Sequence, residues 1–182
     1  MKFSGVILIC VCAFAACNRP IKGRNGVVYK SAVQYNDYIV TRQTTLMQNV
    51  LDLIKAADHN IDSAENMLNR FVGQTASMIE EIKGMPAYKG DSALRDAAVR
   101  SFIFYKKVFG KDYMQIIQIR KKGIEVTNED IAEANRIVEK ITEEEGDYDK
   151  RFHEAQKNFA AKNNMKLRDN EMQKKFEKEI GQ

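Results

Sequence analysis

From Ser31 onward, apolar residues recur at intervals of three and four positions, and this spacing predicts amphipathic helices rather than strands. Charged and capping residues divide the pattern into four segments. The four segments are approximately residues 31–57, 62–83, 92–122 and 127–163. Long amphipathic helices with short connections pack most simply side by side in alternating directions. The sequence therefore predicts an all-α fold, an up-down-up-down four-helix bundle.

The fourth segment carries the clearest helix signals. It opens with Thr127-x-x-Asp130, which resembles a capping box, and acidic residues follow in its first turn. Its apolar residues form a coiled-coil-like seam with one polar interruption at Glu145. The seam residues are Ile131, Ala134, Val138, Ile141, Tyr148, Phe152, Ala155 and Phe159. Such a seam serves packing within one chain or a dimer equally well, so the pattern leaves the oligomeric state open.

The N-terminus has the pattern of an export signal. A lysine at position 2 precedes an apolar stretch that ends in small residues directly before Cys17. The stretch is shorter than the roughly 20 residues that span a bilayer. The pattern predicts that residues 1–16 are a lipoprotein signal peptide and that Cys17 is acylated. Ala13-Phe14-Ala15 also fits the ordinary signal peptidase, but that cleavage would leave Cys17 as a free thiol in an oxidising compartment.

Charge and glycine content predict a flexible tether over residues 17–30. This stretch holds four basic residues, no acidic residue, one Pro and two Gly. Its basic residues could bind anionic lipid headgroups or only solvate the linker. The predicted bundle, residues 31–164, has 19 basic and 21 acidic residues, so the basic pI does not indicate a nucleic-acid partner. Residues 165–182 are expected to form a polar C-terminal tail.

Cysteine and histidine positions exclude several kinds of chemistry. All three cysteines lie within the first 17 residues, so the predicted bundle has no thiol for a disulfide or a thiolate metal site. Neither histidine, His59 or His153, has a Glu three positions before it, as di-iron bundles require. Phosphate-binding loops and nucleophile elbows are also absent from the sequence. We therefore expect no metal, no cofactor and no enzymatic activity.

Four polar residues fall within the apolar seams. Counted from a shared end of the bundle, Arg42, Ser77, Tyr105 and Glu145 have nearly the same height. Because a lone carboxylate in an apolar seam needs a partner, the spacing predicts an Arg42–Glu145 ion pair near the Tyr105 hydroxyl. One interpretation of this layer is a ligand-sensing or proton-active site. The other is a polar layer that fixes the register of the helices.

The third segment has more aromatic residues than one seam would bury. Phe104 and Tyr113 are the candidates for an exposed patch, which would indicate a partner-binding surface. The alternative is that a wide bundle face buries both rings.

Several blocks resemble a family of uncharacterised bacterial surface lipoproteins, which was first named from spirochaete genomes and is common in the Bacteroidetes. The similarity lies in Tyr35-Asn36-Asp37-Tyr38-Ile39-Val40, Tyr88-Lys89-Gly90-Asp91, Phe102-x-Phe104-Tyr105-Lys106-x-Val108-Phe109, Glu129-Asp130-Ile131 and Phe152-x-x-Ala155-Gln156-x-x-Phe159-Ala160. It covers nearly the whole chain after the signal and departs mainly at Phe14 and after Leu167. The resemblance implies export, acylation and a helical bundle, and it supplies no activity or catalytic residue.

Together these patterns predict a non-enzymatic lipoprotein of the bacterial cell envelope. Acylated Cys17 would hold it in membrane lipid, with the outer membrane as the expected location, and the bundle would bind an envelope protein or glycan. The alternative function is a small-ligand or pH sensor built on the polar layer.

Overall fold

The computed structural model describes residues 20–168, 175 and 178–179, and the predicted four-helix bundle is confirmed. The helices are α1 (Ala32–His59), α2 (Ile61–Lys83), α3 (Ala93–Lys107), α4 (Tyr113–Lys121) and α5 (Asn128–Lys162). The π-helical turn η1 (Val108–Asp112) joins α3 to α4, so these two helices form one continuous rod. The short 3-10 turn η2 (Gly123–Glu125) leads from α4 towards α5.

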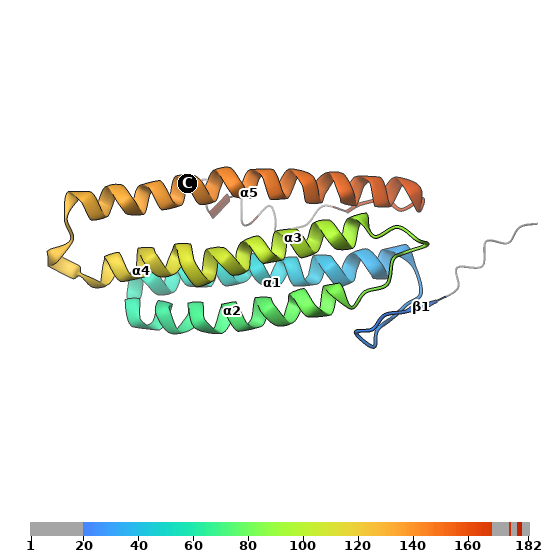
Figure 1. The fold of residues 1–182 in the computed structure, drawn as a ribbon, viewed down its shortest axis with the longest axis horizontal. Helices are drawn as coiled ribbons and strands as arrows, with labels where there is room; N and C mark the ends of the chain where they lie inside the picture. The colour runs from blue at the N-terminus through green and yellow to red at the C-terminus, as the bar shows by residue number, and fades with distance from the viewer. Residues whose placement is uncertain (1–19, 169–174, 176–177, 180–182) are drawn as a thin grey trace, which may run out of the picture.

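The four rods lie side by side in an elongated molecule. In Figure 1, α3 and α4 form one line between α5 and α2, and α1 lies behind them. Helix α2 packs against both α1 and α3, and α3 packs against α5. A small hairpin of β1 (Ile21–Lys22) and β2 (Val28–Tyr29) lies where α1 begins and α2 ends. We call this end of the rod the hairpin end, and the end that holds η2 the distal end.

Capping residues explain where the helices begin. The side chain of Ser31 accepts a hydrogen bond from the Gln34 amide at 3.2 Å. The predicted capping box is confirmed at α5, where Thr127 and Asp130 each accept a hydrogen bond from the other's backbone amide. Helix α2 begins at Ile61, which is earlier than the start predicted from a cap at Asp62 or Ser63. Asn60 ends α1 and also caps α2, because its side chain accepts from the Ser63 amide at 2.9 Å.

The third rod contains a π-turn that the hydrophobic pattern did not indicate. The Tyr113 amide donates to the Val108 carbonyl, five residues back, so one extra residue is inserted into the helix. Gly110 lies within this turn, where an added Cβ would come within 3.3 Å of Val72 Cγ2 on α2. The small residue therefore lets the turn approach α2 closely.

The prediction of a flexible tether is wrong for residues 20–30. These residues form the β1–β2 hairpin, which packs onto the bundle through Tyr29, a side chain only 1% exposed. Its Gly26 adopts a φ of +80°, so the glycine serves a specific turn rather than general flexibility. The folded domain therefore includes the hairpin, and the predicted start at residue 31 is too late.

The predicted seam of α5 is buried over only part of its length. Ile141, Phe152 and Phe159 lie in the core, whereas Ile131 and Val138 are half exposed. Ile137 is the residue buried in that part of the helix instead. A 3.6-residue helical period drifts relative to a strict heptad over a helix of this length, which explains the change of face.

Three sequence predictions concern residues that the structure does not describe in full. The signal peptide and Cys17 lie outside the described residues, as does most of the predicted tail. The described tail residues include Met165, which packs against the core, and Glu179, whose carboxylate lies 3.6 Å from Lys55 Nζ of α1. Within the part of the chain that is described, no helix has the length and apolar character needed to cross a membrane.

Candidate functional site

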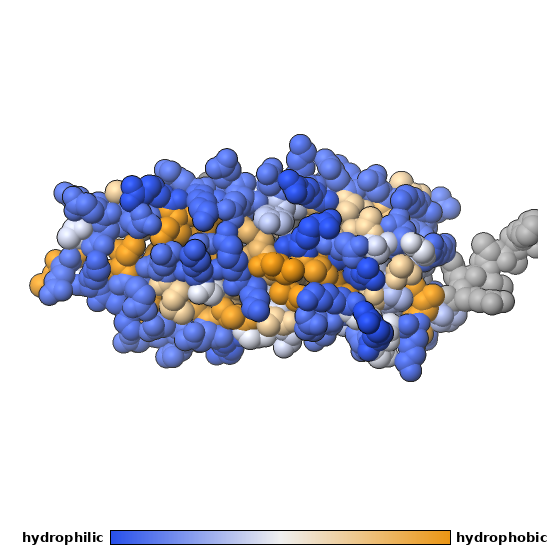
Figure 2. Space-filling model, viewed as in Figure 1, coloured by the Kyte–Doolittle hydropathy of each residue, from blue (hydrophilic) through white to orange (hydrophobic). Residues whose placement is uncertain are grey.

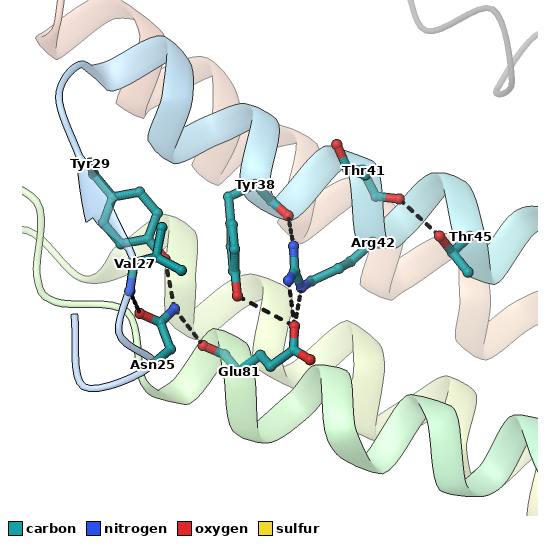
Figure 3. Close-up of polar contacts among 8 residues, drawn as sticks. All are labelled: Asn25, Val27, Tyr29, Tyr38, Thr41, Arg42, Thr45 and Glu81. Atoms are coloured by element: carbon teal, nitrogen blue, oxygen red, sulfur yellow. Dashed lines mark hydrogen bonds and ion pairs between the residues drawn. The ribbon is translucent and has the colours of Figure 1, made fainter. Parts of the chain in front are cut away.

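The side chain of Asn25 forms hydrogen bonds both within the hairpin and to the bundle. Its amide nitrogen donates to the Tyr29 hydroxyl at 2.7 Å and to the Glu81 carbonyl of α2 at 3.0 Å. Its side-chain oxygen accepts from the Val27 amide at 3.1 Å. Figure 3 shows these contacts between the hairpin and α2. One residue thus shapes the turn of the hairpin and fixes it to the end of α2.

Arg42 forms its ion pair on the surface of α1 and α2, not in the core. Its Nε donates to Glu81 Oε2 at 2.7 Å, and its guanidinium lies over the Tyr38 ring, 3.4 Å from the centroid (Figure 3). The Tyr38 hydroxyl donates to the same carboxylate oxygen at 3.3 Å. The predicted Arg42–Glu145 pair is therefore wrong. Equal height along the bundle does not determine the direction in which a side chain points, because successive residues of an α-helix are about 100° apart around its axis.

A cluster of five aromatic rings connects the hairpin to the helices. Tyr35 is its centre, with neighbouring ring centroids 5.1–5.4 Å away. The cluster consists of Tyr29, Tyr35, Tyr38, Tyr88 and Phe159. Burial raises the pKa of the Tyr29, Tyr38 and Tyr88 hydroxyls above the ordinary value. The rings therefore stay neutral and act as packing, and they hold the hairpin in one position relative to α1 and α5.

Tyr105 and Glu145 form the polar contact that the sequence predicted between the third and fourth rods. The Tyr105 hydroxyl donates to Glu145 Oε1. Burial raises the pKa of the Glu145 carboxyl, and the hydrogen bond from Tyr105 partly opposes this. Burial also raises the pKa of Tyr113, with the nearby charge of Glu145 as the second cause. This carboxyl thus faces two tyrosines in the core, without the arginine that was predicted as its partner.

Ser77 does not belong to this layer. It is exposed, and its hydroxyl donates to the Gly73 carbonyl of its own helix at 3.3 Å. Thr75, two residues earlier on α2, is the buried hydroxyl, and its Oγ1 has no hydrogen-bond partner among the described residues. The predicted four-residue layer is therefore reduced to one pair, Tyr105 with Glu145.

Phe104 and Tyr113 do not form an exposed patch. Phe104 is 3% exposed and stacks on Tyr148 of α5, with the ring centroids 4.7 Å apart. Tyr113 is half-buried and packs against the core, where its ring centroid is 6.3 Å from that of Phe109. The prediction of a partner surface at these two rings is wrong, because a wide face of the α3–α4 rod is covered by α5.

The π-turn buries a carboxylate that the sequence analysis missed. Asp112 is 3% exposed, and its Oδ2 has no hydrogen bond but lies 3.7 Å from Lys107 Nζ. Lys107 also pairs with Glu144 of α5 at 2.5 Å. The lysine therefore bridges α5 and the π-turn. No sequence signal separated Asp112 from the solvent-facing charges around it, because its burial depends on the inserted residue.

A different apolar surface lies at the distal end. Ile124 of η2 is fully exposed, and Ile131 and Val138 of α5 are 50% and 49% exposed. Ile131 and Val138 are seven residues apart and therefore lie on one side of α5. In Figure 2, hydrophobic atoms reach the surface at the tip formed by η2, amid largely hydrophilic surroundings. We call Ile124, Ile131 and Val138 the distal stripe.

Comparisons with other proteins and a search for metal ligands complete the description. Among the described residues, no group of three or more His, Cys, Asp or Glu side chains could hold a metal ion. No protein-family model, curated protein or solved structure matched the chain. The candidate site therefore rests on the geometry of this chain alone, with the hairpin junction at one end of the rod and the distal stripe at the other.

Proposed function

We propose that this chain is a lipid-anchored, non-enzymatic protein of the bacterial cell envelope, whose bundle presents the distal stripe to a protein partner. The observation that carries the proposal is the fixed hairpin. Pro20, the first described residue, is three positions after Cys17 and leads directly into β1. Three extended residues span at most about 11 Å. An acyl anchor at Cys17 would therefore hold the bundle by its hairpin end, close to the membrane.

The distal stripe supports a protein partner. Three aliphatic side chains are half to fully exposed, with Ile124 and Ile131 at the end of the rod opposite the anchor and Val138 about two turns further along α5. A clustered apolar surface of this kind is typical of sites that bind other proteins.

Acyl labelling tests the anchor. In cells that produce the full chain, we expect a metabolically incorporated fatty-acid label on the wild type, and the protein in the membrane fraction. The Cys17→Ser variant is expected to lose both the label and the membrane association. An unlabelled, soluble wild type would contradict the anchor.

Site-specific crosslinking tests the partner surface. A photoreactive side chain at Val138 should capture a distinct protein from the envelope of living cells. The matched control is Ile103 on α3, which is 49% exposed and lies outside the distal stripe. If positions 103 and 138 give the same products, the distal stripe is not a specific partner surface.

A second function, pH or ligand sensing, is favoured by one observation, the hydrogen bond between buried Tyr105 and half-buried Glu145, whose carboxyl has a raised pKa. A proton-sensitive contact between two rods could change how they pack. The pH dependence of unfolding in the wild type and in Glu145→Gln tests this function directly.

A further inference from the structure

The outer face of the hairpin combines an exposed aliphatic residue with a basic one. Lys22 and Val28 are directly opposite each other in the two strands. Because side chains alternate between the two faces of a strand, these two point away from the face on which Tyr29 is buried. Val28 is 45% exposed, and Val33 in the first turn of α1 is 50% exposed.

Positive charge around this face is not neutralised by acidic neighbours. Lys22, Arg24 and Lys30 are exposed and have no ion-pair partner among the described residues, and residues 20–30 contain no acidic side chain. The acidic side chains of α2 and the α2–α3 connection nearby are engaged by other basic residues. The ion pairs are Glu81 with Arg42, Glu80 with Lys83, and Asp91 with Lys162. Residues 20–30 therefore carry a net charge of +3, with no ion pair to an acidic side chain among the described residues.

The distance to the predicted anchor lets this charge act on a membrane. Pro20 follows Cys17 by three positions, and three extended residues span at most about 11 Å. Electrostatic attraction is screened over about 8 to 10 Å at physiological ionic strength. Since these lengths are comparable, the hairpin would remain within the field of an anionic bilayer whenever the anchor is inserted.

We propose that the outer face of the hairpin binds anionic phospholipid headgroups directly, with Lys22, Arg24 and Lys30 paired to phosphates and Val28 inserted shallowly among them. This inference rests on the proposed anchor and adds a second membrane contact to it. An exposed aliphatic side chain within a basic surface is the combination that favours the boundary between headgroups and acyl chains. The aromatic cluster fixes the hairpin, so headgroup contact would also orient the whole rod.

The test uses the chain from residue 18 onward, without the anchor. All described contacts lie within residues 20–179, so this chain keeps the entire described core. Binding is measured by co-sedimentation with vesicles of phosphatidylcholine alone, or of phosphatidylcholine and phosphatidylglycerol in equal amounts. We expect binding only to the anionic vesicles, and weaker binding as salt is added.

Two matched triple variants separate a specific hairpin site from general charge. Replacing Lys22, Arg24 and Lys30 by Gln should weaken binding to anionic vesicles on the order of a hundredfold, since each basic residue near such a surface contributes about a factor of five. Replacing Lys106, Lys111 and Lys150 by Gln removes the same charge from the sides of the rod, where all three are exposed. The control should bind within a few-fold of the wild type.

Three results would overturn the inference: equal binding to neutral vesicles, no binding to anionic vesicles, or an equal loss in the control variant. Helical content and thermal unfolding of each variant establish that it is folded. None of these outcomes depends on acylation of Cys17. A negative result with vesicles therefore does not decide whether the anchor exists, which the fatty-acid labelling experiment tests separately. An unlabelled wild type with intact vesicle binding would instead reject the anchor alone.

Discussion

At the scale of single residues, Glu145 combines burial with a neutral donor. Its carboxylate accepts from the Tyr105 hydroxyl, and no described basic side chain pairs with it. Burying a charge without a counter-charge costs free energy, and burial accordingly raises the pKa of this carboxyl above 4.5. The protonated form is therefore favoured in the folded state relative to the unfolded chain.

The Glu145→Gln variant tests this cost. A carboxyl with a raised pKa in the folded state stabilises the fold below its unfolded pKa, and this stability is lost as the pH rises through its folded pKa. The contribution of Glu145 to the free energy of unfolding should therefore fall as the pH rises from 4.5. The amide keeps an acceptor for Tyr105 but cannot ionise, so the variant should lack this part of the pH dependence. Urea unfolding of both proteins across the acidic to neutral range measures it.

A control variant separates the charge from the hydrogen bond. Tyr105→Phe leaves Glu145 without its donor, and we expect a loss of about 1–3 kcal/mol at neutral pH. If Glu145→Gln shows the same pH profile as the wild type, the carboxyl is not a proton-sensitive group and the sensor function is rejected.

The polar residues also show how far a sequence can locate contacts. The spacing of Tyr105 and Glu145 on their helices was enough to predict that they meet. Arg42 was assigned the wrong partner because its direction depends on the rotation of α1 about its axis, which places it beside Tyr38 and Glu81. Asn25 gave no signal, because its role depends on where the chain before α1 packs.

At the scale of elements, the hairpin depends on Asn25. Asn25→Ala would remove both hydrogen bonds of its side-chain nitrogen, leaving the buried Tyr29 hydroxyl without its donor. We expect a loss of about 1–3 kcal/mol in stability and faster amide hydrogen exchange within residues 20–30. Gln34→Ala is the matched control, since among the described residues the Gln34 side chain accepts only from the exposed Lys30 amide. Equal exchange in the hairpin of both variants would contradict the role of Asn25.

The π-turn makes an unusual deletion tolerable. Removing Lys111 from η1 would bring Tyr113 four residues from Val108, so the existing hydrogen bond becomes an ordinary α-helical one and both flanks keep their faces. Removing Lys106 from α3 would instead rotate one flank by about 100° relative to the other. We expect the first deletion to fold and the second to lose cooperative thermal unfolding. Both lysines are exposed, so neither deletion removes a core side chain.

Element boundaries were predictable where the signal is local. The capping box at Thr127 and the left-handed Gly123 at the end of the third rod are properties of a few neighbouring residues, and both are present. The π-turn and the hairpin were missed because packing against α2 determines them. Gly110 and Tyr29 acquire their roles only when that helix lies beside them.

At the scale of the whole molecule, the fixed hairpin predicts an upright rod. Helix α5 has 35 residues, and at 1.5 Å per residue it is roughly 50 Å long. If the anchor holds the hairpin end, a fluorophore on Arg24→Cys should be quenched by a quencher in the lipid headgroups, and one on Ile124→Cys should not. In this proposal Cys17 is acylated, and the other two cysteines are removed with the signal peptide. Each added cysteine is therefore the one free thiol of the protein. Equal quenching at both positions would indicate a rod that lies flat on the bilayer.

The single-residue connection at Asn60 has a consequence for how the chain folds. Helices α1 and α2 are joined by the shortest link in the bundle, so the entropy lost in bringing them together is small. The contact between Gln156 of α5 and Asn36 of α1, by contrast, closes a loop of 120 residues. We therefore expect the α1–α2 pair to assemble first and α5 to join last. During synthesis from the N-terminus, the first half of the bundle would be available to pair before η2 and α5, which carry the distal stripe, have emerged.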